Sequence, residues 1–430
     1  MIHYGVEGTD LVALDTQFVY AAGDQPVYDE GGAQIGAIPA AADGTFTIQS
    51  LNYYSKSAAR YELLSLVTPY GIGLDLGPEG KTFTFDVTDF APILKGKRRL
   101  SVEFGGENQE ELDIQFWFIK GTPEREVLDI QNIWPEGRGY FSEIQADQRF
   151  EPRQVPLSAD ASHFKIRSAI TGHDQNGEFV PREHYINING GAQEFTYDVW
   201  KECSKNPIYP QGGTWVFDRA GWCPGMATDV HSFSLDGIAA PGETIEIDYG
   251  VNGGSMSAAN YLVNNLLVSY GPDHAQTDAS IESIIRPNNK AVEYARINPA
   301  CSTPTILVKN TGTQQIESML ISYATAPWNA ETYTWNGNLE PQASEEIVLP
   351  QPHQGFWQEG GFFTATILQV NEVADENTEN NVMQSTFDQV RVYDYVDPIQ
   401  LRIQTNATGG DYFYKIKNEA GSVVLLRNNM

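Results

Sequence analysis

The stretch Cys203–Met226 reads C-S-K-N-P-I-Y-P-Q-G-G-T-W-V-F-D-R-A-G-W-C-P-G-M and is the part of the chain densest in glycine, tryptophan, proline and cysteine. Strands of alternating apolar residues are predicted on both sides of it, so we expect an ordered surface loop rather than a linker. Ordered loops of this length usually carry function. The preceding sequence adds histidine and glutamate, with I-T-G-H-D-Q-N-G-E-F at Ile170–Phe179 and R-E-H-Y-I-N-I-N-G at Arg182–Gly190.

Two of the three cysteines, Cys203 and Cys223, bracket this loop, and Cys301 stands alone. A separation of 20 residues with turn residues in between suits a disulfide that holds a functional loop. The alternative is two free buried thiols. A zinc site is disfavoured because no C-x-x-C or H-x-x-x-H spacing accompanies the pair.

The charge of the chain argues against one class of partner. Its 430 residues include 56 acidic and 27 basic ones, which gives a formal net charge of -29. Nucleic-acid binding needs Lys and Arg clustered on one face, so we expect no nucleic-acid partner. The plainer reading of this charge is solubility. We also predict no membrane span, because no apolar run is long enough.

Strand signals dominate the chain and helical periodicity is sparse. Gly, Pro, Asn and Asp clusters separate the strand-like runs at short intervals. Many short strands without alternating helices predict sandwiches or jelly rolls. A helical turn or two is expected at Thr88–Leu94 and at Ser257–Val268. Clear strand-like runs are Phe83–Val87, Leu112–Ile119, Tyr185–Ile188 and Thr305–Val308.

Shifts in composition divide the chain into four predicted domains. Residues 1–138 and 139–280 form two units, and 285–388 has the length and regular strands of an immunoglobulin-like sandwich. The tail at 390–430 adds strands at Ile399–Ile403, Tyr412–Ile416 and Ser422–Leu426. About 40 residues make a marginal domain, so we expect a truncated β-rich module.

The N-terminus shows no signal peptide, because Ile2–Asp10 lacks a cationic segment followed by an apolar one. The chain is then either cytoplasmic or trimmed at its ends, and the cut-off tail favours trimming.

One acidic run, Asn371–Asn381, reads N-E-V-A-D-E-N-T-E-N-N. Its oxygen side chains could bind calcium. A turn between two strands explains the run more simply.

Several of these motifs resemble the peptide-N-glycosidase F family. The elements N-P, Q-x-G-x-W and D-R-A-G-W-C-P-G-M of Cys203–Met226, together with Gly172–Asn189, look like its C-terminal jelly roll. Val67–Gly71, Phe85–Phe90 and Lys120–Pro123 resemble its N-terminal jelly roll. The resemblance covers roughly residues 40–270 and implies two side-by-side eight-stranded jelly rolls with the active site between them, in an all-β chain. The later modules look like those of secreted multidomain relatives in Gram-negative bacteria.

The resemblance implies an amidohydrolase that cleaves the amide between Asn and the first N-acetylglucosamine of an N-glycopeptide. Water attack on that carbonyl needs an activating carboxylate and acidic groups near the leaving nitrogen. In register with the family, Glu103 and Glu178 are the two assisting carboxylates. Arg219, Trp222 and His173 correspond to substrate-site positions, and Cys203–Cys223 matches a family disulfide.

One departure from the family concerns the water-activating Asp. The family carries it in a W-D-R-like loop before the T-P-Y strand, whereas Asn52–Arg60 holds no Asp. The second hypothesis is therefore a non-catalytic cell-surface module that binds a glycan or a protein, the latter also through the immunoglobulin-like domain. Whether the chain is an enzyme stays open at this stage.

A third hypothesis follows from the copper-dependent peptidylglycine α-hydroxylating monooxygenases of the same superfamily. Those bind copper through His pairs and a Met, whereas this chain has no His-His or His-x-His. His173, His184 and Met226 are weak candidates for a metal site. Surface or hydrogen-bonded histidines are the simpler reading, so we expect no cofactor. The resemblance implies secretion or display on a Gram-negative cell surface.

Overall fold

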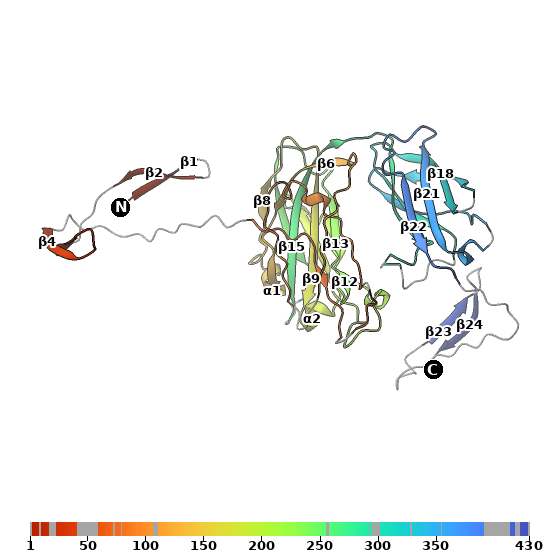
Figure 1. The fold of residues 1–430 in the computed structure, drawn as a ribbon, viewed down its shortest axis with the longest axis horizontal. Helices are drawn as coiled ribbons and strands as arrows, with labels where there is room; N and C mark the ends of the chain where they lie inside the picture. The colour runs from red at the N-terminus through yellow and green to blue at the C-terminus, as the bar shows by residue number, and fades with distance from the viewer. Residues whose placement is uncertain are drawn as a thin grey trace. The chain divides into compact units, whose positions relative to one another are not determined.

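The computed structural model describes residues 2–7, 10–16, 23–40, 59–71, 74–78, 80–105, 111–254, 258–291, 293–294, 302–326, 329–353, 355–390, 413–417 and 422–428. Strands account for almost all of the regular structure (Figure 1), as the sequence predicts. The chain divides into two compact units, Met1–Arg60 and Tyr61–Met430. Among the described residues, no helix is both long and apolar enough to cross a membrane.

The first unit consists of two antiparallel hairpins in its described part. Strand β1 (Ile2–Glu7) pairs with β2 (Asp10–Thr16), and β3 (Gly23–Tyr28) pairs with β4 (Gln34–Ala40). The Asp29 carboxylate closes the second turn by accepting hydrogen bonds from the backbone N–H groups of residues 31 and 33, each at 2.9 Å. The division between the units falls inside the predicted domain 1–138, and the N-terminal jelly roll stays a prediction.

The segment from Tyr61 to Glu124 contains few regular elements among its described residues: β5 (Leu66–Val67) and the 3-10 helix η1 (Thr88–Phe90). The helical turn expected at Thr88–Leu94 is therefore present. The strands expected at Phe83–Val87 and Leu112–Ile119 are not formed. A strand requires a neighbour for its backbone hydrogen bonds, and these two runs have no strand partner in the described part of the chain.

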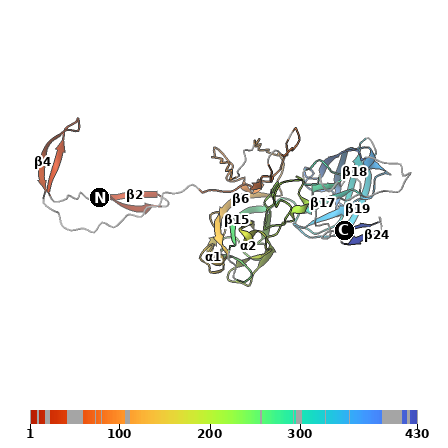
Figure 2. The same ribbon diagram turned by 90° about the horizontal axis from the view of Figure 1, so that it is seen from below.

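The described residues between 125 and 273, in the second compact unit, form an eight-stranded jelly roll. Both β6 and β7 pair with β15 and together count as strand position 1, and β8, β9, β10, β11, β13, β14 and β15 then take positions 2 to 8. The two antiparallel sheets have the orders 1-8-3-6 and 2-7-4-5, which is jelly-roll topology. Figure 2 shows β6 beside β15. The strands are β6 (Arg125–Asn132), β7 (Gly137–Tyr140), β8 (Arg153–Pro156), β9 (His163–His173), β10 (Glu183–Ile188), β11 (Phe195–Asp198), β13 (Val230–Ser234), β14 (Thr244–Val251) and β15 (Asn260–Asp273).

The core of this jelly roll lies between its two sheets. Ile166 and Ile170 of β9, Ile186 of β10, and Tyr249 and Tyr261 are almost completely buried there. Inward residues on β10 alternate with partly exposed ones, as the strand period of two requires. The predicted strand Tyr185–Ile188 is confirmed. The short helices α1 (Phe141–Gln145) and α2 (Gln175–Glu178) and the strand β12 (Met226–Ala227) lie in its loops.

Strand β15 is buried along nearly its whole length. One face packs in the jelly-roll core, and on the other Leu266, Val268 and Tyr270 contact Phe90 and neighbouring apolar residues. The predicted helical turn at Ser257–Val268 is wrong for the residues that the structure describes. A strand covered on both faces loses its apolar–polar alternation, so its period cannot distinguish it from a buried helix.

The described residues between 279 and 387, also in the second compact unit, form a sandwich of seven antiparallel strands around its own core. Three strands form one sheet in the order β16-β17-β20, and four form the other in the order β19-β18-β21-β22. The predicted strand at Thr305–Val308 is confirmed within β17. Seven strands agree with an immunoglobulin-like domain, and that assignment stays a prediction. The strands are β16 (Ala279–Arg286), β17 (Thr305–Asn310), β18 (Ile316–Thr325), β19 (Glu331–Leu339), β20 (Ser344–Val348), β21 (Gly361–Val370) and β22 (Val382–Phe387).

The tail holds one antiparallel hairpin among its described residues, β23 (Phe413–Lys417) with β24 (Val423–Asn428). These strands confirm two of the three predicted there. The third, Ile399–Ile403, lies outside the described residues.

We predict that Ile166→Ala destabilises the jelly roll by about 2–5 kcal/mol, because the substitution leaves a cavity in a core that cannot collapse fully. Val230→Ala on the exposed side of β13 is the matched control, with an expected change of about 0.5 kcal/mol or less. Differential scanning calorimetry of the whole chain measures both. Equal shifts in the two variants would contradict the assignment of the core.

Candidate functional site

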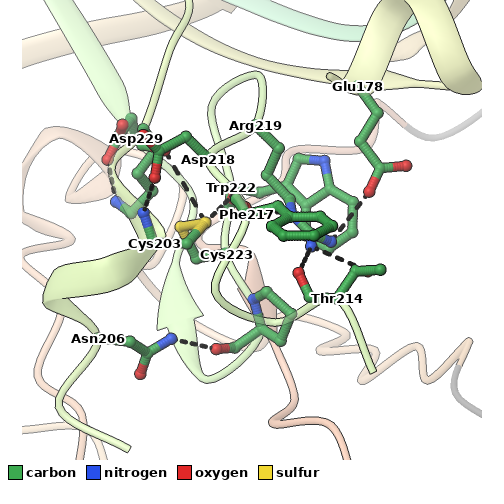
Figure 3. Close-up of a disulfide and its surroundings, with 12 residues drawn as sticks. Glu178, Cys203, Asn206, Thr214, Phe217, Asp218, Arg219, Trp222, Cys223 and Asp229 are labelled. Carbon is green, nitrogen blue, oxygen red and sulfur yellow. Dashed lines mark hydrogen bonds and ion pairs between the residues drawn. A yellow bond between two sulfur atoms is a disulfide. The ribbon is translucent and has the colours of Figure 1, made fainter. Parts of the chain in front are cut away.

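The side chain of Arg219 organises the loop between Cys203 and Met226. It is completely buried. Its Nη1 donates to Glu178 Oε1 at 2.9 Å, and its Nε donates to the carbonyl of Phe217 at 3.1 Å. Its Nη2 donates to the carbonyl of Thr214 and, at 3.3 Å, to the Thr214 hydroxyl (Figure 3). All of these hydrogen bonds are made to groups of the protein itself.

Aromatic rings cover the remaining surface of this guanidinium. Its Cζ atom lies 4.6 Å from the ring centre of Trp222, 5.1 Å from Phe179 and 5.8 Å from Tyr70. Such contacts attract a cation to the ring face, most strongly when water is excluded. The Trp222 ring is fixed in turn by its Nε1, which donates to the carbonyl of Gly172 at 2.9 Å. Arg219 is thus bound by an acid, two backbone carbonyls and three rings.

Glu178 is the partly exposed acid beside the buried Arg219. It ends helix α2, and its backbone carbonyl accepts a hydrogen bond from the N–H of Ala220 at 2.9 Å. Its side chain is 18% exposed, whereas that of Arg219 is fully covered. Burial raises the pKa of the Glu178 carboxyl, Arg219 opposes that rise, and Asp174 adds to it. One carboxylate oxygen binds Arg219, which leaves the second for a ligand or water.

His173 packs on the Trp222 ring with ring centres 5.9 Å apart and planes 24° apart. Its Nε2 is 2.8 Å from the hydroxyl of Thr171. Burial first and then the Arg138 charge lower the pKa of His173 to about 4, and Asp174 partly opposes them. The imidazole is therefore neutral at neutral pH and offers a hydrogen bond rather than a positive charge.

The predicted disulfide is present between Cys203 and Cys223, with Cα atoms 5.5 Å apart. Both cysteines are fully buried. The N–H of Cys203 donates to the Asp218 carboxylate at 2.9 Å. Lys201 pairs with Arg219 through two backbone hydrogen bonds, and its side chain forms an ion pair with Asp229 (Figure 3). The disulfide and this backbone pair clamp the loop at its two ends.

The segment from Ser65 to Gly71 attaches to this loop by backbone hydrogen bonds. Strand β5 pairs with β12, and the N–H of Gly225 donates to the carbonyl of Val67 at 2.7 Å. The N–H of Gly212 donates to the Tyr70 carbonyl at 2.7 Å, and the Tyr70 N–H donates to the Gln211 side chain at 2.7 Å. These bonds bring the Tyr70 ring to Arg219.

The Gln211 carboxamide links three pieces of chain. Its oxygen accepts from the Tyr70 N–H, and its nitrogen donates to the carbonyls of Ile208 at 2.8 Å and Pro224 at 3.0 Å. Neither Gln211 nor Tyr70 was among the predicted site residues. The available signals were the T-P-Y and Q-x-G-x-W elements that contain them.

The two predicted catalytic glutamates differ in their settings. Glu178 lies in the cluster just described, whereas Glu103 is exposed on a stretch outside any named strand. Their joint action stays a prediction. The stretch 52–60, expected to hold the family's Asp, lies outside the described residues except for residues 59 and 60.

The weak metal candidates lie in separate surroundings. His184 is fully buried in the jelly-roll core, where its Nδ1 is 2.8 Å from the Tyr249 hydroxyl and burial lowers its pKa to about 3. Met226 belongs to β12, and His173 packs on Trp222. In the part of the chain that the structure describes, no three His, Cys, Asp or Glu side chains are grouped as metal ligands.

Comparison with known proteins agrees with this geometry. Residues 140–270, which include the jelly-roll loops and the disulfide, match the family described as peptide-N-glycosidase F, C terminal. This segment is similar to the C-terminal domain of that family. The chain is 27% identical over 230 residues to the peptide-N(4)-(N-acetyl-beta-D-glucosaminyl)asparagine amidase F of Elizabethkingia miricola. That match covers 49% of this chain and 64% of the relative, so the chain spans less than two-thirds of the relative's length.

Two solved structures of proteins with this description are also similar to parts of this chain. PNGase F, described as a glycosylasparaginase from Flavobacterium meningosepticum, is 23% identical, with 49% of this chain and 73% of that chain covered and a TM-score of 0.35. A crystal structure of peptide-N(4)-(N-acetyl-beta-D-glucosaminyl) asparagine amidase is 28% identical over 29% of this chain and 45% of that chain, with a TM-score of 0.26.

We predict that Arg219→Met destabilises the loop far more than Glu178→Gln. The Met variant leaves the Glu178 carboxylate and two carbonyls without their donor, which costs roughly 3–5 kcal/mol for a buried pair. The Gln variant keeps an acceptor oxygen for Arg219. Thermal unfolding and the rate of limited proteolysis within residues 203–226 measure the difference. Equal sensitivity of the two variants would contradict a bracing role for Arg219.

The neutral His173 predicts a pH effect on stability. Its pKa is about 4 in the folded state and 6.5 in the reference state, so the unfolded chain binds a proton first as the pH falls. The free energy of unfolding should therefore decrease between about pH 6.5 and pH 4. His173→Gln should flatten part of that decrease. Urea unfolding at pH 7 and pH 4.5 measures the free energy of unfolding of both proteins. An equal decrease between these pH values in wild type and His173→Gln would refute the low pKa of His173.

Proposed function

We propose that this chain is a peptide-N-glycosidase F-like amidohydrolase that acts on the Asn–N-acetylglucosamine amide of N-glycopeptides. The observation that carries the proposal is the Glu178 carboxylate, partly exposed and ion-paired to the buried Arg219, within the segment that matches the family. The named relative is an asparagine amidase of this kind. Both the family match and this relative support an N-glycanase-like function for the chain at the level of the family.

The chemistry of the proposed reaction assigns Glu178 an assisting role. Water attacks the amide carbonyl, the C–N bond breaks, and the leaving glycosylamine nitrogen takes up a proton, which leaves an Asp in the peptide. A carboxylate that accepts a hydrogen bond can hold the attacking water or a sugar hydroxyl in place. The charge of Arg219 favours the carboxylate form of Glu178 against the burial that raises its pKa, and Glu103 is the second proposed carboxylate.

The surroundings of Glu178 are suited to a sugar. The ring of Phe217 is exposed and lies at 84° to the Phe179 ring, with centres 6.5 Å apart. Ligand sites typically combine aromatic walls with a few placed polar groups. In this proposal the buried Arg219 and Trp222 hold Glu178 and the loop in place and do not touch the sugar. His173 packs on the Trp222 ring.

A binding module on the same fold is the second candidate, and the burial of Arg219 favours it. A guanidinium that is fully covered and hydrogen-bonded to three protein residues is not accessible to a ligand. We also propose a secreted location, because disulfides persist in oxidising compartments. A Gram-negative source and a protein partner of the seven-stranded sandwich stay predictions.

Treatment of a denatured N-glycoprotein with the whole chain tests the amidase proposal. We expect release of free glycan together with conversion of the glycosylated Asn to Asp, both measured by mass spectrometry. Glu178→Gln should lower kcat/KM by roughly 100-fold or more, since it removes a positioned carboxylate. Glu202→Gln, which alters an exposed residue of the same loop paired with Lys205, should leave the rate unchanged.

The other outcomes separate the two candidates. Retention of glycopeptide on immobilised wild-type protein without any Asn-to-Asp conversion would replace the amidase by a binding module. Equal activity of wild type and Glu178→Gln would remove Glu178 from the site while leaving the family assignment intact.

A further inference from the structure

Helix α2, which ends at Glu178, is attached to the start of strand β15. The helix follows β9 directly, and the last residue of β9, His173, lies opposite Asn260 in the sheet (Figure 1). On its other side Asn260 is paired with Tyr140 of β7, and it is 1% exposed. A buried amide needs hydrogen-bond partners for both of its ends, so the partners of Asn260 indicate what this residue does.

Both ends of the Asn260 carboxamide are bonded to charged residues. Arg138 Nη1 donates to Asn260 Oδ1, and Asn260 Nδ2 donates to Asp174 Oδ2. Arg138 and Asp174 are themselves exposed. The two charges determine which way the amide faces, because only its oxygen accepts from a guanidinium and only its nitrogen donates to a carboxylate. Asn260 thus joins a cation on β7 to the acid that immediately precedes helix α2.

The backbone of Asp174 has a conformation that residues other than glycine rarely adopt. Its φ is 62° and its ψ is 165°. Such a conformation persists only where the surrounding contacts determine it. The carbonyl of Asp174 accepts hydrogen bonds from the N–H groups of Gly177, at 3.0 Å, and Glu178, at 2.7 Å. The bond from Asn260 to the Asp174 carboxylate therefore acts on the residue from which the helix is built.

Close packing also ties helix α2 to Asn260. A Cβ atom on Gly177 would lie 2.9 Å from the carbonyl oxygen of Asn260 and 3.0 Å from its nitrogen, so the absence of a side chain allows this approach. At the end of the helix, the carbonyl of Glu178 accepts a hydrogen bond from the N–H of Ala220 at 2.9 Å. The helix is thus held between the start of β15 and the loop 203–226.

We propose that Asn260 is a positioning residue of the candidate site and that it places the Glu178 carboxylate by holding Asp174 and the start of helix α2. This inference rests on the proposed amidase function, in which Glu178 holds the attacking water or a sugar hydroxyl. Displacement of a catalytic group by about 1 Å can lower a rate by about 100-fold. Two contacts then determine where the carboxylate lies: Arg219 binds its oxygen at 2.9 Å, and Asn260 fixes the backbone that carries it.

Exchange of two side chains tests the proposal. Asn260→Asp keeps the shape and the acceptor for Arg138, but it removes the donor to Asp174 and sets two carboxylates against each other. It should lower kcat by roughly 10- to 100-fold, and lower it more than it raises KM. Addition of Asp174→Asn to this variant restores a hydrogen bond between the two positions, donated in the reverse direction, and should recover most of the rate.

The other sheet of the jelly roll offers a matched control. Asn187 Nδ2 donates to Asp248 Oδ2 at 3.2 Å, which is the same pair of residue types between β10 and β14. Asn187→Asp should lower the unfolding temperature and leave kcat unchanged. Near-ultraviolet circular dichroism at the assay temperature checks that each variant is folded. Wild-type kcat in folded Asn260→Asp, an equal loss in Asn187→Asp, or no recovery in the folded double variant overturns the positioning role.

Hydrogen–deuterium exchange separates this inference from the amidase function. The backbone amides of residues 174–179 should exchange faster in Asn260→Asp than in wild type and slow again in the double variant, whether or not the chain cleaves glycopeptides. Unchanged exchange in folded Asn260→Asp overturns the inference. A wild-type chain that releases no glycan overturns the proposed function instead, and the exchange rates then decide whether Asn260 holds the helix.

A second variant decides the matter should Asn260→Asp not fold. Asp174→Gly removes the same hydrogen bond, and glycine adopts the backbone conformation of this position without strain. The unfolding temperature should therefore stay close to that of wild type, while kcat falls and the amides of residues 174–179 exchange faster. Wild-type kcat together with wild-type exchange in Asp174→Gly overturns the positioning role.

Discussion

Burial of the Arg219 guanidinium in a loop closed by a disulfide is the constraint on which the candidate site depends. Removing a guanidinium from water is costly unless acceptors surround it. Here the acceptors come from separate pieces of chain, with Glu178 on helix α2 and Thr214 and Phe217 in the loop itself. If one acceptor is lost, the others must hold a charge that is less compensated. The position of Glu178 and the shape of the loop are therefore linked through a single side chain.

The loop can surround Arg219 because its two ends are held together. The Cys203–Cys223 bond lies beside the backbone pair of Lys201 with Arg219, and both restrict the loop before any side chain packs. Gln211 then ties Tyr70 to the carbonyls on each side of the loop. The contact between Tyr70 and Gln211 joins residues that are distant in sequence. A loop with this composition consequently needs a scaffold of rigid strands, which β9, β10 and β15 provide.

Much of this was predictable where one residue pattern determines one outcome. The spacing of Cys203 and Cys223 predicted their bond, and Tyr185–Ile188 formed a strand because its period of two survives on a strand with one covered face. Ser257–Val268 misled because β15 is covered on both faces. Leu112–Ile119 misled because β-propensity measures fit to a sheet rather than the presence of one.

The site was less predictable than the fold, and the reason is physical. A motif specifies that Arg219, Trp222 and Glu178 come together, and the structure places all three in one cluster. It does not specify which of them water can reach, because burial depends on loop packing contributed by residues such as Tyr70 and Gln211. The resemblance of this motif to the peptide-N-glycosidase F family suggests a sugar ligand for Arg219, yet here the guanidinium is covered.

Because Trp222 and the disulfide are buried, a ligand at the proposed site would meet the partly exposed Glu178 and the exposed Phe217 before either of them. The electrostatics favour the same order of contact. Burial favours the neutral acid at Glu178, and the Arg219 charge favours the carboxylate. In the proposed function, a sugar hydroxyl or a water that binds Glu178 would meet an acid whose carboxylate form is favoured by Arg219 and disfavoured by burial. In the proposed function, Arg219 would act on a ligand only through Glu178, which makes it a proposed positioning residue.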